Sequence, residues 1–166
     1  MAIFLIGFMG AGKTTVGKRL GEIQKLQVID IDEYIEEKTG SLIKDMFKEY
    51  GENHFRTLES AALKELMEKE AVITTGGGIV ERKENIELLA QERNVFHLFC
   101  SFDVLWGRLE GDSNRPLVQK NSVDGLSKLY GRRLPLYRSV STMEIDTTNK
   151  SIDEIISELG QKISTD

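Results

Sequence analysis

Residues 7–15, which read "GFMGAGKTT", follow the apolar run Ala2–Ile6, "AIFLI". An uninterrupted apolar run is typical of a central parallel strand that is covered on both faces. When a glycine-rich turn joins such a strand to a helix, its backbone N–H groups can surround an anion at the helix N-terminus. We therefore expect this stretch to bind a phosphate group and to anchor an α/β fold.

The spacing of the turn matches the Walker A pattern, in which two glycines with four residues between them precede a lysine and a threonine. The pattern assigns Lys13 to the β and γ phosphates of a nucleotide and the Thr14 hydroxyl to Mg²⁺. A turn that only packed a strand against a helix would not need all of these positions. The nucleotide-binding residues expected here are Gly10, Ala11, Gly12, Lys13, Thr14 and Thr15.

Apolar runs and helical patterns alternate along the rest of the chain. Short apolar runs predict strands at residues 2–6, 27–30, 71–75, 94–100 and 142–146. Helical patterns predict helices at residues 13–24, 32–40, 41–51, 54–69, 82–93 and 103–111, with Ser41 as the N-cap of the third. Repeated strand-then-helix order is typical of parallel strands joined by right-handed crossovers. We therefore predict a single α/β domain over residues 1–166.

The composition fits one domain and argues against several classes of protein. The chain has 166 residues, 40% of them apolar, and a net charge of -5, so a broad surface for nucleic acid is not expected. One cysteine permits no internal disulfide, which agrees with a reducing compartment. The N-terminal apolar run is too short to span a membrane and lacks the basic flank of a signal peptide. We expect a soluble cytoplasmic monomer that binds neither nucleic acid nor a membrane.

Carboxylates and glycines follow two of the predicted strands. Strand alternation places Asp30 and Asp32 on the same side, where one can hold the water shell of Mg²⁺ and the other can face a substrate hydroxyl. Alternatively, Asp32 only caps the next helix. Residues 74–78, "TTGGG", expose bare backbone at the edge where ligands of parallel sheets bind, or they form a flexible turn.

Positive charge is concentrated in one part of this acidic chain. Residues 108–138 contain seven basic residues against three acidic ones. Arg115 lies in residues 110–122, which have no apolar period and are expected to form a mobile loop, so that this arginine can close on the transferring phosphoryl group. Arg133 can bind a carboxylate. For each arginine the alternative is a solvated helix face.

Phosphate binding alone does not separate a kinase from a nucleotide-dependent switch. A GTPase needs an Asn-Lys-x-Asp loop, and "NKSID" at residues 149–153 has Ile152 where the aspartate belongs. A switch that acts on a protein partner would leave Arg133 and the triple glycine without a purpose. A small-molecule kinase would use both, and gluconate kinase and nucleoside monophosphate kinase are alternatives of that kind.

Six segments together resemble the shikimate kinase family, in matching order and spacing over nearly the whole chain: "GFMGAGKTTVGKRL", "DIDEYIEEKTGSLIKDMF", "GENHFRTLES", "TTGGGIV", "NRPL" and "RRLPLYRSV". The resemblance implies a P-loop kinase with three αβα layers, a five-stranded parallel sheet of order 2-3-1-4-5 and a lid. It also implies transfer of the ATP γ-phosphoryl group to the 3-hydroxyl of shikimate, with Mg²⁺. The position after Arg56, basic in some members, is Thr57 here.

The resemblance implies a role for each matching residue. Lys13, Asp32 and Arg115 would be catalytic, with Asp32 at the shikimate hydroxyls. The nucleotide would contact the Walker A residues, Arg108 and Arg115. Thr14 and Asp30 would serve Mg²⁺. The shikimate-binding residues implied are Asp32, Arg56, Gly76, Gly77, Gly78 and Arg133.

Overall fold

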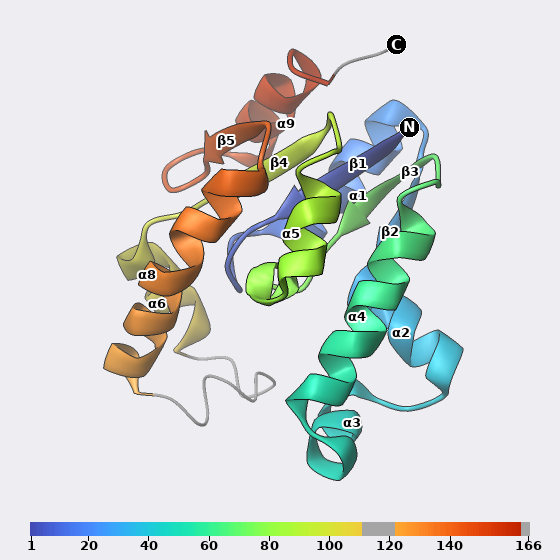
Figure 1. Ribbon diagram of the computed structural model, residues 1–166. Helices are drawn as coiled ribbons and strands as arrows, with labels where there is room; N and C mark the ends of the chain where they lie inside the picture. Colours follow the sequence, from blue (N-terminus) through green and yellow to red (C-terminus); the bar gives the residue numbers. More distant parts are fainter. Residues whose placement is uncertain (111–121, 164–166) are drawn as a thin grey trace.

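The computed structural model describes residues 1–110 and 122–163. Its strands are β1 (Ala2–Ile6), β2 (Gln27–Asp30), β3 (Ala71–Thr74), β4 (Val95–Phe99) and β5 (Met143–Asp146). They pair in parallel in the order β2-β3-β1-β4-β5 (Figure 1). The predicted order is therefore confirmed, and the predicted strands agree with the observed ones to within one residue at each end.

Helices cover both faces of the sheet. They are α1 (Lys13–Gln24), α2 (Ile31–Thr39), α3 (Ile43–Tyr50), α4 (Glu52–Leu66), the short 3₁₀ helix η1 (Ile79–Glu81), α5 (Lys83–Leu89), α6 (Phe102–Leu109), α8 (Val123–Val140) and α9 (Ile152–Gly160). Helix α1 packs on the sheet and against α9, whereas α8 packs on β4 and against α5. Figure 1 shows α5 and α8 in front of the sheet and α1 behind it, which gives the expected three layers.

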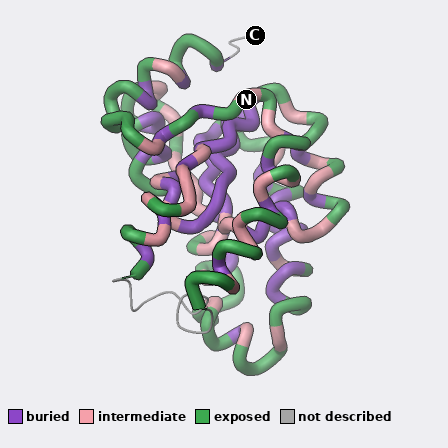
Figure 2. The backbone as a smooth tube through the Cα atoms, turned by 90° about the vertical axis from the view of Figure 1, so that its left-hand side faces the viewer, coloured by how far each residue is buried: buried purple, intermediate pink, exposed green. Residues whose placement is uncertain are grey.

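The core lies between the middle strands and the helices. All five residues of β1 and all four of β3 are buried, as the apolar run of β1 predicts, whereas the edge strands β2 and β5 are largely half-exposed or exposed. Figure 2 shows the buried segments running through the centre of the molecule. Within the described ranges, no helix is long and apolar enough to span a membrane.

Helices α8 and α9 were not expected from the sequence. Helix α8 has 18 residues and contains Pro135, which has no N–H group and usually ends a helix. Here Pro135 is on the exposed side. The buried positions Leu126, Arg133, Tyr137 and Val140 recur at helical spacing. This spacing could have revealed the helix, but an arginine on the buried face and a proline on the other concealed it.

Two helix starts differ from the predictions by two residues, and three others differ by one. Helix α3 begins at Ile43, and Ser41 is not its cap. Instead, the Ile43 N–H donates to Glu36 Oε1 of α2 at 2.8 Å. Helix α4 begins at Glu52, before the predicted residue 54. At the start of α3, the Glu36 side chain of the preceding helix thus replaces a local cap, and a sequence pattern does not reveal such a pairing.

Candidate active site

The phosphate-binding turn joins β1 to α1. Gly10 and Gly12 have φ angles of 81° and 94°, which residues with a side chain rarely adopt. Lys13, the first residue of α1, donates from Nζ to the carbonyl oxygens of Gly7, at 2.7 Å, and Phe8, at 2.9 Å. The turn thus encloses a lysine that is only 9% exposed. The Lys13 ammonium and the N-terminus of α1 both place positive charge at this turn.

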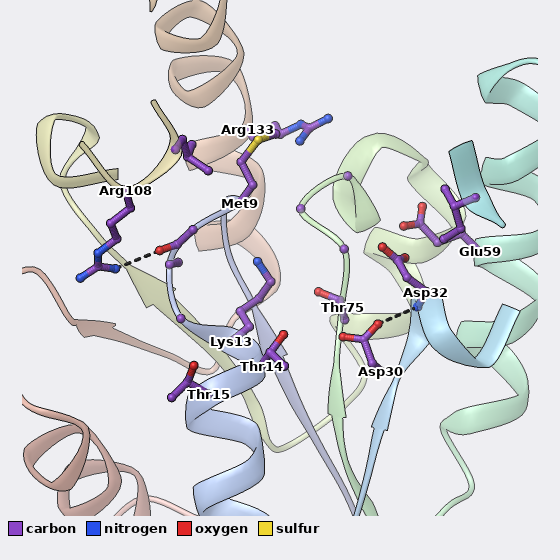
Figure 3. A pocket seen from close by; sticks show the side chains of 18 of the residues that line it. Met9, Lys13, Thr14, Thr15, Asp30, Asp32, Glu59, Thr75, Arg108 and Arg133 are labelled. Carbon is purple, nitrogen blue, oxygen red and sulfur yellow. Dashed lines mark hydrogen bonds between the residues drawn. The ribbon is translucent and has the colours of Figure 1, made fainter. Parts of the chain in front are cut away.

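A cavity of about 1230 Å³ opens beside the turn, at the edge where the parallel strands end (Figure 3). Its walls come from the segments after β1, β2 and β3 and from α3, α4, α6 and α8. The predicted site residues that line it are Gly10, Ala11, Gly12, Lys13, Thr14, Thr15, Asp30, Asp32, Arg56, Gly76, Gly77, Gly78, Arg108 and Arg133. Arg115 and residues 111–121 of the predicted lid lie outside the described residues.

Asp30 and Asp32 make different contacts. Strand β2 ends at Asp30 and Asp32 is in α2, so the strand alternation used to place them does not apply, although both line the cavity. Asp30 is the N-cap of α2: its Oδ1 accepts the N–H groups of Asp32, at 3.0 Å, and Glu33, at 3.3 Å. Its Oδ2 accepts the Thr74 hydroxyl at 2.7 Å. The capping role considered for Asp32 therefore belongs to Asp30.

Two carboxylate oxygens beside Gly76 are buried without a donor. A Cβ atom on Gly76 would lie 3.2 Å from Asp32 Oδ1 and 3.3 Å from Glu59 Oε1. Among the described residues, neither oxygen has a hydrogen-bond partner. Because an unpaired buried acceptor is costly, this pair indicates a place for the hydroxyl groups of a ligand.

Arg56 is a residue of α4 and lines the cavity. Its Nη1 donates to Glu59 Oε2 at 2.7 Å and its Nη2 to Glu52 Oε1 at 3.2 Å. A Cβ atom on Gly78 would overlap the Arg56 guanidinium, so a side chain at this position would displace the arginine from where it lies. Glu59, three residues further along α4, lies on the same face of the helix and thus holds Arg56.

Arg133 reaches the cavity from α8 and is 3% exposed. Its Nε donates to Glu81 Oε1 at 2.6 Å. A Cβ atom on Gly77 would lie 3.4 Å from Arg133 Nη1, and the Tyr137 hydroxyl donates to the Gly77 carbonyl at 2.5 Å. Helix α8 therefore supplies a guanidinium and also fixes the triple-glycine turn beside it.

The electrostatics of the cavity raise the pKa of two of its carboxyl groups. Burial raises the pKa of Asp32 to about 7, with added effects of Asp30 and Glu59, against the opposing effects of Lys13 and Arg56. Burial also raises the pKa of Glu59, which Arg56 opposes. A carboxyl group with a pKa near the working pH suits proton transfer.

The other end of the cavity faces the segment after β5. Arg108 of α6 donates to the Gly10 carbonyl at 2.9 Å and so lies against the phosphate-binding turn. Thr147, Lys150 and Ile152 line the cavity as well. This end offers a flat guanidinium and an apolar side chain near the turn, a combination that suits a nucleotide base.

Comparisons with known proteins identify the family of this chain. The family model described as shikimate kinase matches residues 9–164. A shikimate kinase of Bacillus cytotoxicus is 44% identical over 164 residues, which cover 99% of each chain. The chain belongs to the shikimate kinase family. A second shikimate kinase, from Staphylococcus aureus, is 40% identical over 95% of this chain and 90% of its own.

Solved shikimate kinase structures share the fold. One from Acinetobacter baumannii, in complex with shikimate, has a TM-score of 0.90 at 39% identity and covers 96% of this chain and 90% of its own. One from Aquifex aeolicus has a TM-score of 0.81 at 31% identity, covering 97% and 94%. The chain is thus an ATP-dependent phosphotransferase and a P-loop kinase of aromatic amino acid biosynthesis.

The shikimate kinase resemblance did not point to several cavity residues. They are Met9, Ile43, Lys44, Phe47, Lys48, Glu52 and Phe55. Ile43 and Phe47 of α3 lie four residues apart. This spacing is typical of an apolar helix face that packs on the core, so it does not indicate a cavity wall. Their place beside the cavity depends on how α3 packs against α4, and no local pattern carries that information.

Proposed function

We propose that the protein transfers the γ-phosphoryl group of ATP to the 3-hydroxyl of shikimate, giving shikimate 3-phosphate and ADP. The observation that supports this most is the group around the triple-glycine turn. Two guanidinium groups, of Arg56 and Arg133, lie against the same turn as two donor-free carboxylate oxygens, of Asp32 and Glu59. Arginine binds a carboxylate and a free carboxylate oxygen accepts a hydroxyl proton. A small hydroxylated carboxylic acid matches both requirements.

The phosphate-binding turn defines the other half of the reaction. Lys13, Thr14 and Thr15 stand at the N-terminus of α1, and all line the cavity that Arg56 and Arg133 also reach. Nucleotide phosphates at the turn would therefore face an acceptor at the arginines. Phosphoryl transfer involves little covalent chemistry by the protein, so positioning and charge stabilisation carry the catalysis.

Asp32 would orient the attacking hydroxyl and accept its proton as the phosphoryl group is transferred. Lys13 would turn from the carbonyls of its own turn to the β and γ phosphates. The resemblance assigns Arg115 to the same charge, and this role stays a prediction because Arg115 lies outside the described residues. The single-domain organisation, monomeric state and cytoplasmic location also stay predictions.

The residues assigned to Mg²⁺ fit a partly hydrated ion. The Thr14 side chain lines the cavity and is exposed, so its hydroxyl is available as a ligand. Both oxygens of Asp30 already accept protein donors, which suits a carboxylate that receives hydrogen bonds from metal-bound water. When bound, Mg²⁺ would neutralise charge on the β and γ phosphates.

A screen of acceptors tests the proposal. ADP release is measured with shikimate, gluconate, AMP or no acceptor, at equal concentrations. We expect shikimate to give at least about a hundredfold more turnover than the others, because the other acceptors leave buried polar groups of the site unpaired. Turnover with gluconate or AMP but not shikimate would contradict the proposal. Slow hydrolysis that no acceptor changes would favour a nucleotide-dependent switch instead.

A further inference from the structure

Glu81, at the end of η1, joins two neighbouring arginines of α8. Its Oε1 accepts from Arg133 Nε at 2.6 Å and from Arg132 Nη2 at 2.9 Å, while its Oε2 accepts from Arg132 Nη1 at 2.7 Å. The Glu81 N–H in turn donates to the Gly78 carbonyl at 2.9 Å. The backbone of Glu81 is therefore tied to the same turn that carries the triple glycine.

The contact with Glu81 determines which edge of Arg133 is available to a ligand. Nε is occupied by the carboxylate, whereas Nη1 lies on the side of Gly77, at the cavity. The guanidinium carbon is also 5.9 Å from the centre of the Phe8 ring. A free arginine side chain has many rotamers. These contacts restrict the rotamers of Arg133 before a ligand binds, so binding costs less conformational entropy.

Glu81 and Arg132 do not line the cavity in the described part of the chain, although Arg133 does. Burial raises the pKa of Glu81, but the hydrogen bonds from Arg132 and Arg133 outweigh it and hold the pKa below its usual value. Glu81 is thus ionised at neutral pH. Arg132 is 57% exposed and Arg133 3%, so one carboxylate links a buried arginine to a solvated one.

We propose that Glu81 is a positioning residue for the acceptor: it holds the Arg133 guanidinium by Nε, so that the Nη end meets the acceptor's carboxylate. This inference rests on the proposed function and adds a residue that touches neither substrate. The positioning role explains why a negatively charged side chain lies close to a site for an anionic acceptor. Without a positioning role, a carboxylate here would only weaken the attraction between Arg133 and that acceptor.

A double-mutant cycle between Glu81 and Arg133 tests the inference. KM for shikimate, KM for ATP and kcat are measured for Glu81→Ala, Glu81→Gln, Arg133→Ala and Glu81→Ala with Arg133→Ala, together with calorimetric binding of shikimate. We expect Glu81→Ala to raise KM for shikimate about tenfold, with KM for ATP and kcat changed less than about twofold. Glu81→Gln keeps an accepting oxygen and should fall between the wild type and Glu81→Ala.

The cycle separates positioning from a general structural effect. If Glu81 acts through Arg133, Glu81→Ala adds nothing once Arg133 is alanine. The matched control is Arg132→Ala, which removes the other partner of Glu81 and should leave KM for shikimate within about twofold. If Glu81→Ala does not fold, Glu81→Gln in both backgrounds gives the same cycle.

Three results would overturn the inference: an unchanged KM for shikimate in both Glu81 variants, the same rise in KM in the Arg133→Ala background, or an equal rise in Arg132→Ala. These outcomes are distinct from failure of the proposed function. A normal KM for shikimate in Arg133→Ala itself would contradict the proposed acceptor site. A raised KM in Arg133→Ala beside normal Glu81 variants would contradict only the role of Glu81.

Discussion

Replacing Lys13 with alanine is expected to lower kcat by about a thousandfold, because a preorganised positive charge at the transferring phosphoryl group is lost. Lys13 is 9% exposed and enclosed by its own turn, with hydrogen bonds to the Gly7 and Phe8 carbonyls. Water would not replace its charge equally well in such a place. The measurement is kcat for ADP release at saturating ATP and shikimate.

Lys18→Ala is the matched control for this prediction. Lys18 is exposed on the same helix, so its removal takes away one positive charge without changing the turn. We expect kcat of Lys18→Ala to stay within about twofold of the wild type. A Lys13→Ala enzyme that keeps its melting temperature and at least half of its kcat would show that the lysine has no part in the chemical step.

Asp32→Asn is expected to lower kcat by about a hundredfold or more, because the attacking hydroxyl loses its proton acceptor. In the wild type, kcat/KM for shikimate should rise as pH increases through about 7, where Asp32 becomes deprotonated. Asp32→Asn should lose this dependence. Asp45→Asn, a change at an exposed position on α3, should keep both the rate and the pH profile.

The same pKa predicts that Asp32 makes the folded protein less stable above neutral pH. Its pKa of about 7 in the folded state exceeds the ordinary value of 3.8, so the folded state binds the proton more tightly. The cost is absent below pH 3.8, grows between pH 3.8 and 7, and is constant above 7. At pH 8, Asp32→Asn should therefore raise the free energy of unfolding by about 2 to 4 kcal/mol.

Urea unfolding of both proteins at pH 8 and at pH 5 measures this effect. The gain from Asp32→Asn should be smaller at pH 5, since only part of the cost has developed there. A gain that is equal at both pH values, or a loss of stability at pH 8, would show that the Asp32 carboxylate is not strained by burial. An unaltered pH profile of kcat/KM in Asp32→Asn would assign the titration to another group.

The parts of the fold that local patterns encode could be predicted from the sequence. The apolar run of β1 and the glycine spacing after it identified the strand, the turn and α1 with the bounds that the structure has. The sheet order came from the resemblance to a family and not from the periodicity. Helix α8 was missed because Pro135 and the buried Arg133 break the pattern that marks a helix facing an apolar core.

The parts of the site that depend on distant pairings could not be predicted. Helix α2 is capped by Asp30 and not by Asp32 because β2 ends at Asp30, a boundary that sequence patterns do not fix. Glu81 is a further case, because its partners are more than fifty residues away along the chain. The pairing of Arg56 with Arg133 was implied by the resemblance to the family and not by a local pattern, and both residues do line the cavity.

The most direct test of the account is a crystal structure of the protein with shikimate and a non-hydrolysable ATP analogue. The account predicts that the shikimate carboxylate contacts Arg56 and Arg133, that its hydroxyl groups donate to Asp32 and Glu59, and that the terminal phosphate lies at Lys13. Shikimate bound outside this cavity, or inside it with both arginines still paired only to glutamates, would contradict the account.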